Sequence, residues 1–167
     1  DLFSEKLGTA LWLQVMYFIK SIFPYSLQHD YSFNQIPIVS LFSIQSITGI
    51  ILLISSGYAI WYFRIIAPLI SIGLVWYYSS LAIVSNIFFA IGATFAERFL
   101  YAPTFGIILA VMGTLMHFEK NQQISKFKYW MIIGMLIAVN TAVTFNRNKD
   151  WKDAYTLFSA DYPKLQK

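Results

Sequence analysis

Ionisable side chains that could do chemistry are confined to three short stretches of a very apolar chain. Asp30 lies in the first, Glu97 and Arg98 form the second, and Arg147 stands between two asparagines in the third. The planar guanidinium of an arginine can bind a phosphate through two parallel hydrogen bonds. We therefore predict that Arg98 and Arg147 hold a phosphate or pyrophosphate at a membrane surface.

Each of the three places also has a simpler structural interpretation. Asp30 could be a solvated loop acid, since it is the only acid between Glu5 and Glu97. Glu97 and Arg98 could be an ion pair in which each is the nearest partner of the other. Arg147 could be the positive end of a helix that leaves the bilayer. Ionisable residues near membrane depth are costly, which favours a functional role for at least part of this set.

Other kinds of site are excluded by what the sequence lacks. It has no cysteine, which removes disulfides, thiolate metal sites and cysteine nucleophiles. It contains no glycine-rich phosphate loop, no G-x-S-x-G and no H-E-x-x-H motif. We expect His29 and His117 on opposite sides of the membrane, so no metal site is predicted. The net charge of +4 comes without a basic patch interleaved with aromatic residues, and indicates lipid head groups rather than nucleic acid.

The elements that must position these residues are membrane-spanning helices. Of 167 residues, 57% are hydrophobic and 12% are charged, against about 25% charged in soluble domains. No charge occurs at positions 31–63, 65–96, 99–118 or 129–146, and a spanning helix needs about 20 mostly apolar residues. This pattern predicts an all-α polytopic membrane bundle. It excludes a soluble enzyme, a secreted disulfide scaffold and a disordered chain.

Five spans are predicted, at 7–23, 41–63, 65–83, 101–118 and 129–145. Lys20, near the end of the first, is expected to reach the interface with its amine. The piece 87–96 either continues a tilted helix or forms a re-entrant segment. In the fifth span, Gly134, Ala138 and Ala142 form a stripe of small residues that would let another helix approach closely.

The chain is divided into a transmembrane domain, 1–147, and an amphipathic helix, 148–167. Trp151, Ala154, Tyr155 and Phe158 recur at helical spacing and predict one apolar face. Asn148 is the expected N-cap, and the helix is expected to end before Pro163. The chain starts without Met and stops without a closing signal. We therefore expect a piece of a longer protein.

Orientation follows from the cations in the loops. With five spans, one side carries five cations, namely Lys6, Arg64, Lys120, Lys126 and Lys128. The loops of the opposite side carry Arg98, and the tail adds Arg147, Lys149 and Lys152. The loop bias predicts that the first side faces the cytoplasm. Asp30, Glu97-Arg98 and the tail would then share the opposite side.

Three motifs in the same order resemble one known family. Residues 97–106 read E-R-F-L-Y-A-P-T-F-G, similar to the E-R-x-L-Y-x-P-[ST]-x-G signature of the transmembrane and tetratricopeptide-repeat-containing protein O-mannosyltransferases and their bacterial relatives. Pro24-Tyr25, Asp30-Tyr31-Ser32 and Ile36-Pro37 resemble an earlier loop of that family. Asn146-Arg147-Asn148, Trp151 and Leu157-Phe158 resemble the exit of its last membrane span.

The resemblance implies a C-type glycosyltransferase that takes its sugar from a polyprenyl-phosphate donor and transfers it to an acceptor protein on the non-cytoplasmic side. It places the catalytic acid in a first external loop that we expect to lie upstream of this chain. Glu97, Arg98, Arg147 and Asp30 would then serve the donor phosphate or the architecture, and the segment would be inactive alone. It also implies that tetratricopeptide repeats follow the tail.

Two other functions remain open at this point. The chain could be a non-catalytic membrane anchor that presents a repeat domain to partner proteins. A small transporter subunit is disfavoured, because charges at mid-membrane depth are scarce and no repeated pair of broken helices is visible. The abundance of Ile, Phe, Asn and Lys indicates a bacterial inner membrane as the location.

Overall fold

The computed structural model describes residues 2–25, 31, 36–84 and 95–165, and this part of the chain is all-helical. The α-helices are α1 (Leu2–Ile22), α2 (Ile44–Ile66), α3 (Pro68–Ala82), α4 (Tyr101–Lys120), α5 (Lys126–Asn148) and α6 (Ala154–Leu165). Two short 3₁₀ turns join them, η1 (Glu97–Leu100) before α4 and η2 (Lys149–Lys152) before α6. The predicted fold class is confirmed at the level of an all-α chain.

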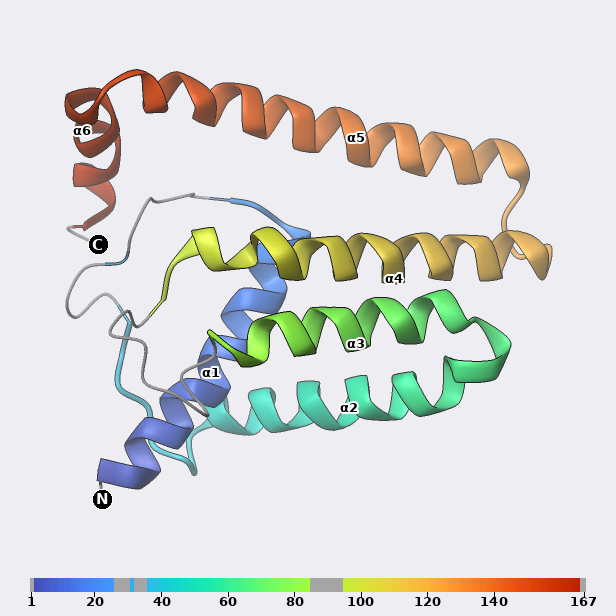
Figure 1. Cartoon of the computed structure of the whole chain (residues 1–167), viewed down its shortest axis with the longest axis horizontal. Helices are drawn as coiled ribbons and strands as arrows, with labels where there is room; N and C mark the ends of the chain where they lie inside the picture. Colours follow the sequence, from blue (N-terminus) through green and yellow to red (C-terminus); the bar gives the residue numbers. More distant parts are fainter. Residues whose placement is uncertain (1, 26–30, 32–35, 85–94, 166–167) are drawn as a thin grey trace.

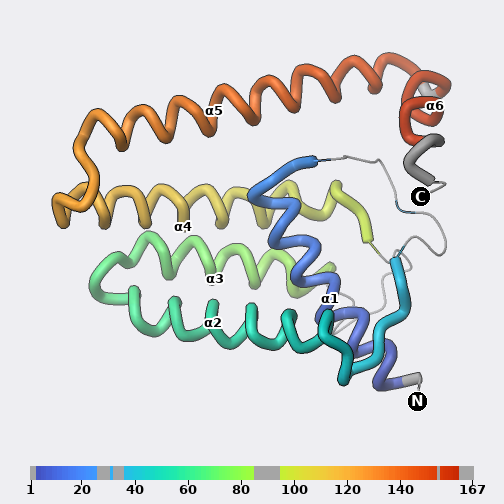
Figure 2. Tube along the Cα trace, turned by 180° about the vertical axis from the view of Figure 1, so that it is seen from behind, coloured from blue at the N-terminus to red at the C-terminus, as the bar shows by residue number. Residues whose placement is uncertain are grey.

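Helices α2, α3, α4 and α5 lie alongside one another, each antiparallel to the next along the chain (Figure 1). Helix α1 lies obliquely across one end of this bundle, as both views show (Figures 1 and 2), and packs on α2, α4 and η1. The same end holds η1 and α6, and we call it the α6 end. The opposite end holds the α2–α3 junction and the α4–α5 connection, and we call it the turn end.

Three helical stretches of the described chain are long and apolar enough to cross a membrane: Ile44–Ile66, Glu97–Lys120 and Lys126–Lys152. They correspond to the predicted spans 41–63, 101–118 and 129–145. The predicted span 65–83 forms the shorter apolar helix Pro68–Ala82. The prediction of five spans is therefore not confirmed, but the chain is an integral membrane protein by its three long apolar helices.

Helix α1 covers the predicted span 7–23 but is not among the three long apolar stretches. The polar residues of α1 lower its apolar content and explain why it is not among these stretches. Gln14 and Lys20 are buried inside the protein, so the Lys20 amine contacts protein groups and is not exposed as expected. The position of α1 also moves Lys6 to the α6 end, which removes it from the cations of the turn end. The loop charge bias that predicted the orientation is therefore smaller, because Lys6 now counts with Arg98 on the other side.

The starts of the long helices follow ordinary capping chemistry. Ser43 caps α2 by accepting a hydrogen bond from the backbone N–H of Ser46, and Ser125 caps α5 by accepting one from Lys128. Pro68 stands in the first turn of α3, as expected, where its missing N–H removes no helical hydrogen bond. These caps fix where the chain turns back at each end of the bundle.

Helices α3 and α4 approach each other closely, and glycines permit it. A Cβ added at Gly73 or at Gly106 would come within 2.5 Å of a backbone atom of the facing helix. Gly113 on α4 faces α3 in the same way. In contrast, helix α5 buries none of its residues, and a Cβ at Gly134 would meet nothing within 4 Å. The predicted stripe on α5 thus packs against nothing in the described chain.

The hydrophobic core lies at the α6 end, where α1, α3 and the chain before α4 meet. Tyr17, Tyr77 and Phe95 are fully buried there. The rings of Tyr17 and Phe95 stack with centroids 4.3 Å apart. Most of the piece 87–96, for which two structures were predicted, lies outside the described residues. This core is the base on which η1 and its ionisable residues are held.

The tail differs from its prediction in three respects. Helix α5 runs through Asn148, so Asn148 does not cap the tail helix; Asp153 does, accepting a hydrogen bond of 2.7 Å from the backbone N–H of Thr156. Helix α6 extends to Leu165 and therefore contains Pro163 instead of ending before it. Trp151 lies in η2 rather than in the helix.

Candidate functional site

The sequence motifs predicted to share one side of the membrane meet at the α6 end. Glu97 and Arg98 lie in η1, and Arg147 lies in the last turn of α5 beside α6 (Figure 1). Tyr31, from the motif that contains Asp30, packs against Phe95 with ring centroids 4.7 Å apart. Asp30 lies outside the described residues, so its predicted role is not tested.

Glu97 is paired with Lys20 of α1, and not with Arg98 as expected. The Lys20 amine lies 2.9 Å from Oε1 of Glu97, and the two side chains are only 7% and 13% exposed. The hydroxyl of Tyr31 donates a second hydrogen bond, of 2.8 Å, to the same oxygen. The Lys20 amine also donates to the backbone carbonyl of Tyr25 at 2.8 Å. We call Lys20, Glu97 and Tyr31 the buried triad.

Two tyrosine rings lie beside the Lys20 amine of the buried triad. The Lys20 amine lies over the rings of Tyr25 and Tyr31, 5.0 and 5.6 Å from their centroids. Burial raises the pKa of Tyr31, and the negative charge of Glu97 raises it further. Burial likewise raises the pKa of Tyr17 to about 12. Both hydroxyls therefore keep their protons at neutral pH, and Tyr31 acts as a donor to the carboxylate.

Arg98 is the exposed cation of this end. It lies next to Glu97 in the sequence, but successive side chains of a 3₁₀ turn point about 120° apart, so Glu97 is half-buried while Arg98 is exposed. Its guanidinium carbon lies 5.3 Å from the ring centroid of Phe99. Within the described part of the chain it makes no ion pair. Arg98 precedes α4, whose N-terminal dipole favours an anion nearby.

Arg147 is already engaged by two carboxylates. Its guanidinium nitrogens lie 2.9 Å from Asp150 and 2.9 Å from Asp161. Asp161, on α6, is only 1% exposed, so this pair ties α6 to the end of α5. The negative charge of Asp161 is also among the causes that raise the pKa of Tyr31. Arg147 thus has less capacity for a phosphate than Arg98.

Two residues of this site, Lys20 and Asp161, were missed by the sequence analysis as site residues. A signal for Lys20 exists, since a lysine in an otherwise apolar helix must either reach the interface or find a carboxylate. No comparable signal singles out Asp161 among the tail acids. In the described residues, no group of three or more His, Asp or Glu side chains could hold a metal ion.

Comparisons with known proteins agree with the motif resemblance over part of the chain. The chain is 36% identical over 74 residues to the human protein O-mannosyl-transferase TMTC3. These aligned residues make up 44% of this chain and 8% of that protein. It is 32% identical over 75 residues to Tmtc3 and 34% identical over 77 residues to Tmtc1, both O-mannosyl-transferases of Drosophila melanogaster. The chain spans less than a tenth of the length of these relatives. No protein-family model and no solved structure matches it.

Proposed function

We propose that this chain is a membrane segment of a glycosyltransferase that takes a sugar from a polyprenyl-phosphate donor and transfers it to protein, in the manner of a protein O-mannosyltransferase. The partial identity to O-mannosyl-transferases from human and fly carries the proposal. The gathering of the motif residues at one end of a membrane-embedded bundle supports it (Figure 1). No catalytic residue is assigned within the chain.

In this proposal Arg98 binds the donor phosphate. It is exposed, it lies at the end of a candidate span where lipid head groups are found, and its guanidinium is not held by a carboxylate among the described residues. Glu97 serves the site by fixing η1 to α1 through Lys20. Arg147 serves it by fixing α6 to α5 through Asp161. Asp30 keeps its proposed place beside the donor.

The α6 end faces the non-cytoplasmic side in this proposal, since the resemblance places sugar transfer there. The location in a bacterial inner membrane and the tetratricopeptide repeats after the tail belong to the same proposal. The acceptor is a protein, as in the names of the relatives.

Donor binding tests the assignment of Arg98. The complete gene product is purified in detergent, and a fluorescent polyprenyl phosphate is titrated against the wild type, Arg98→Lys and Arg98→Ala. Loss of a charge-assisted contact costs about 1.5–3 kcal/mol, or roughly ten- to a hundredfold in affinity. Lysine keeps the charge but loses the planar fork, so Arg98→Lys should also weaken binding.

Arg64→Ala is the matched control, because Arg64 is likewise an exposed arginine but lies at the turn end. Its affinity for the donor should equal that of the wild type. Equal donor affinity in the wild type and in both Arg98 variants would make Arg98 a structural residue.

A further inference from the structure

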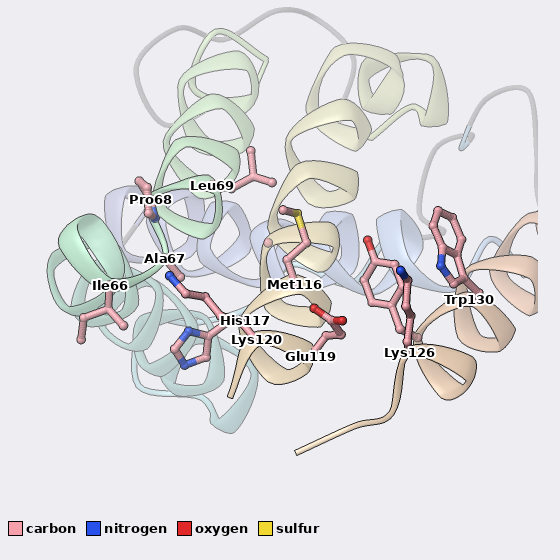
Figure 3. A pocket seen from close by; sticks show the side chains of 12 residues that line it. Ile66, Ala67, Pro68, Leu69, Met116, His117, Glu119, Lys120, Lys126 and Trp130 are labelled. Carbon is pink, nitrogen blue, oxygen red and sulfur yellow. The ribbon is translucent and has the colours of Figure 1, made fainter. Parts of the chain in front are cut away.

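A cavity of about 580 Å³ opens at the turn end, far from the donor site described above. Its walls come from the α2–α3 junction, the last two turns of α4 and the first turns of α5. In Figure 3, Met116 and Glu119 of α4 face Lys126 and Trp130 of α5 across the open space. The cavity therefore separates the ends of two candidate spans, Glu97–Lys120 and Lys126–Lys152.

The charged lining of this cavity is mainly basic. Lys120 and Lys126 line it together with His117, and Glu119 is its acid. Neither lysine forms an ion pair with the described part of the chain, and Glu119 forms none there either. Since Glu119 offsets only one of the two lysines, the cavity attracts an anion, and Arg64 adds a positive charge at the same end.

The rest of the lining is apolar and aromatic, and the cavity lies at the depth of a membrane surface. Met116 and Trp130 line it, and Trp is enriched where the hydrocarbon meets the head groups. Helix α5 buries none of its residues against the chain, so the cavity continues into a helix surface that is open to lipid. A basic pocket between spanning helices is a typical site for a phospholipid head group.

We infer that this cavity binds an anionic membrane phospholipid, with Lys120 and Lys126 on opposite sides of the cavity attracting the lipid phosphate and with the acyl chains along α5 (Figure 3). The cations supply the attraction for the phosphate, and the apolar walls accept the glycerol and the first methylenes. This site is separate from the proposed donor site, because the two lie at opposite ends of the bundle (Figure 1).

Binding to vesicle-derived nanodiscs tests the inference. The complete gene product is purified, and its affinity is measured by native mass spectrometry for phosphatidylglycerol, for phosphatidylcholine and for soluble glycerol phosphate. We expect phosphatidylglycerol to bind most tightly. The double variant Lys120→Gln/Lys126→Gln should lose about thirtyfold in affinity for phosphatidylglycerol, since each lysine near a lipid phosphate contributes about fivefold.

Two further variants make the test specific. Glu119→Gln should bind phosphatidylglycerol more tightly, because it removes the negative charge that faces the phosphate. Lys149→Gln/Lys152→Gln changes two lysines at the α6 end and should leave this affinity unchanged. The inference is overturned if phosphatidylcholine binds as tightly, if glycerol phosphate competes at equal concentration, or if the two double variants lose affinity equally.

Discussion

Substitution of Lys20 tests whether the buried triad holds α1 to the bundle. The variant Lys20→Met keeps the length and most of the volume of the side chain but removes its charge. Glu97 would then be left as a carboxylate that is only 13% exposed, with the hydroxyl of Tyr31 as a remaining donor. The packing of α1 on η1 would lose the ionic link of 2.9 Å between Lys20 and Glu97.

The expected loss of stability in Lys20→Met follows from the burial of the Lys20–Glu97 pair. Removing one partner of a buried ion pair costs about 3–5 kcal/mol, because the remaining charge is uncompensated. The hydrogen bond from Tyr31 persists, so we expect the lower end, about 3 kcal/mol. For a chain of this size, 1 kcal/mol corresponds to roughly 2–4 °C in Tm, which predicts a decrease of about 6–12 °C.

Thermal unfolding in a fixed detergent measures this decrease. Lys6→Met is the control, since Lys6 is an exposed lysine on the same helix, and its Tm should stay close to that of the wild type. The double variant Lys20→Met/Glu97→Gln removes both charges and should recover most of the lost stability. The reasoning is refuted if Lys20→Met is no less stable than Lys6→Met. It is also refuted if the stability losses of Lys20→Met and of Glu97→Gln, each measured alone, simply add in the double variant.

The remaining predictions concern helix packing, capping and topology. Gly106→Val should destabilise the bundle by about 1–3 kcal/mol because its side chain meets the backbone of α3, whereas Gly57→Val meets nothing within 4 Å and should be neutral in the same unfolding assay. Asp153→Ala should speed amide hydrogen exchange in α6, and unchanged exchange would show that the cap is dispensable. The hydrogen bonds from Thr156 lower the pKa of Asp153, so its capping contribution is complete above the unfolded pKa of about 3.9 and is lost as the pH falls through the lowered folded value. An impermeant maleimide should label Lys152→Cys in intact cells and leave Gln123→Cys unlabelled until the cells are opened; labelling of Gln123→Cys in intact cells would reverse the topology.

The long helices were predictable because their signal is local. Uncharged stretches of about the length that a bilayer requires located α2, α4 and α5, and the positions of Pro68 and of the polar connections located their ends. The first segment has the length of a span, but it is not among the three long apolar stretches. What decides its position is the pairing of Lys20 with Glu97, which are 77 residues apart in the chain. A pattern of spacing within one helix carries no information on such a partner.

The small-residue stripe on α5 is a second example of spacing that does not identify a packing partner. Gly134 and its neighbours on α5 have the spacing of a packing surface, yet glycines of other helices, Gly73 and Gly106 among them, are the ones that meet another helix. Spacing shows that a close approach is possible, but only the tertiary arrangement supplies the second helix. At the candidate site, the sequence located Glu97 and Arg98 but paired them with each other, because their side-chain directions depend on the 3₁₀ turn that holds them.

Sugar transfer by the complete gene product tests the central claim most directly. The purified protein is incubated with radiolabelled polyprenyl-phosphate mannose and an acceptor protein, and the label that enters protein is counted. We predict transfer by the wild type and by Arg64→Ala, and a decrease of roughly ten- to a hundredfold in Arg98→Ala at limiting donor. Absence of labelled protein from an intact, donor-saturated wild-type preparation would contradict the account and favour a membrane anchor that presents a partner-binding domain.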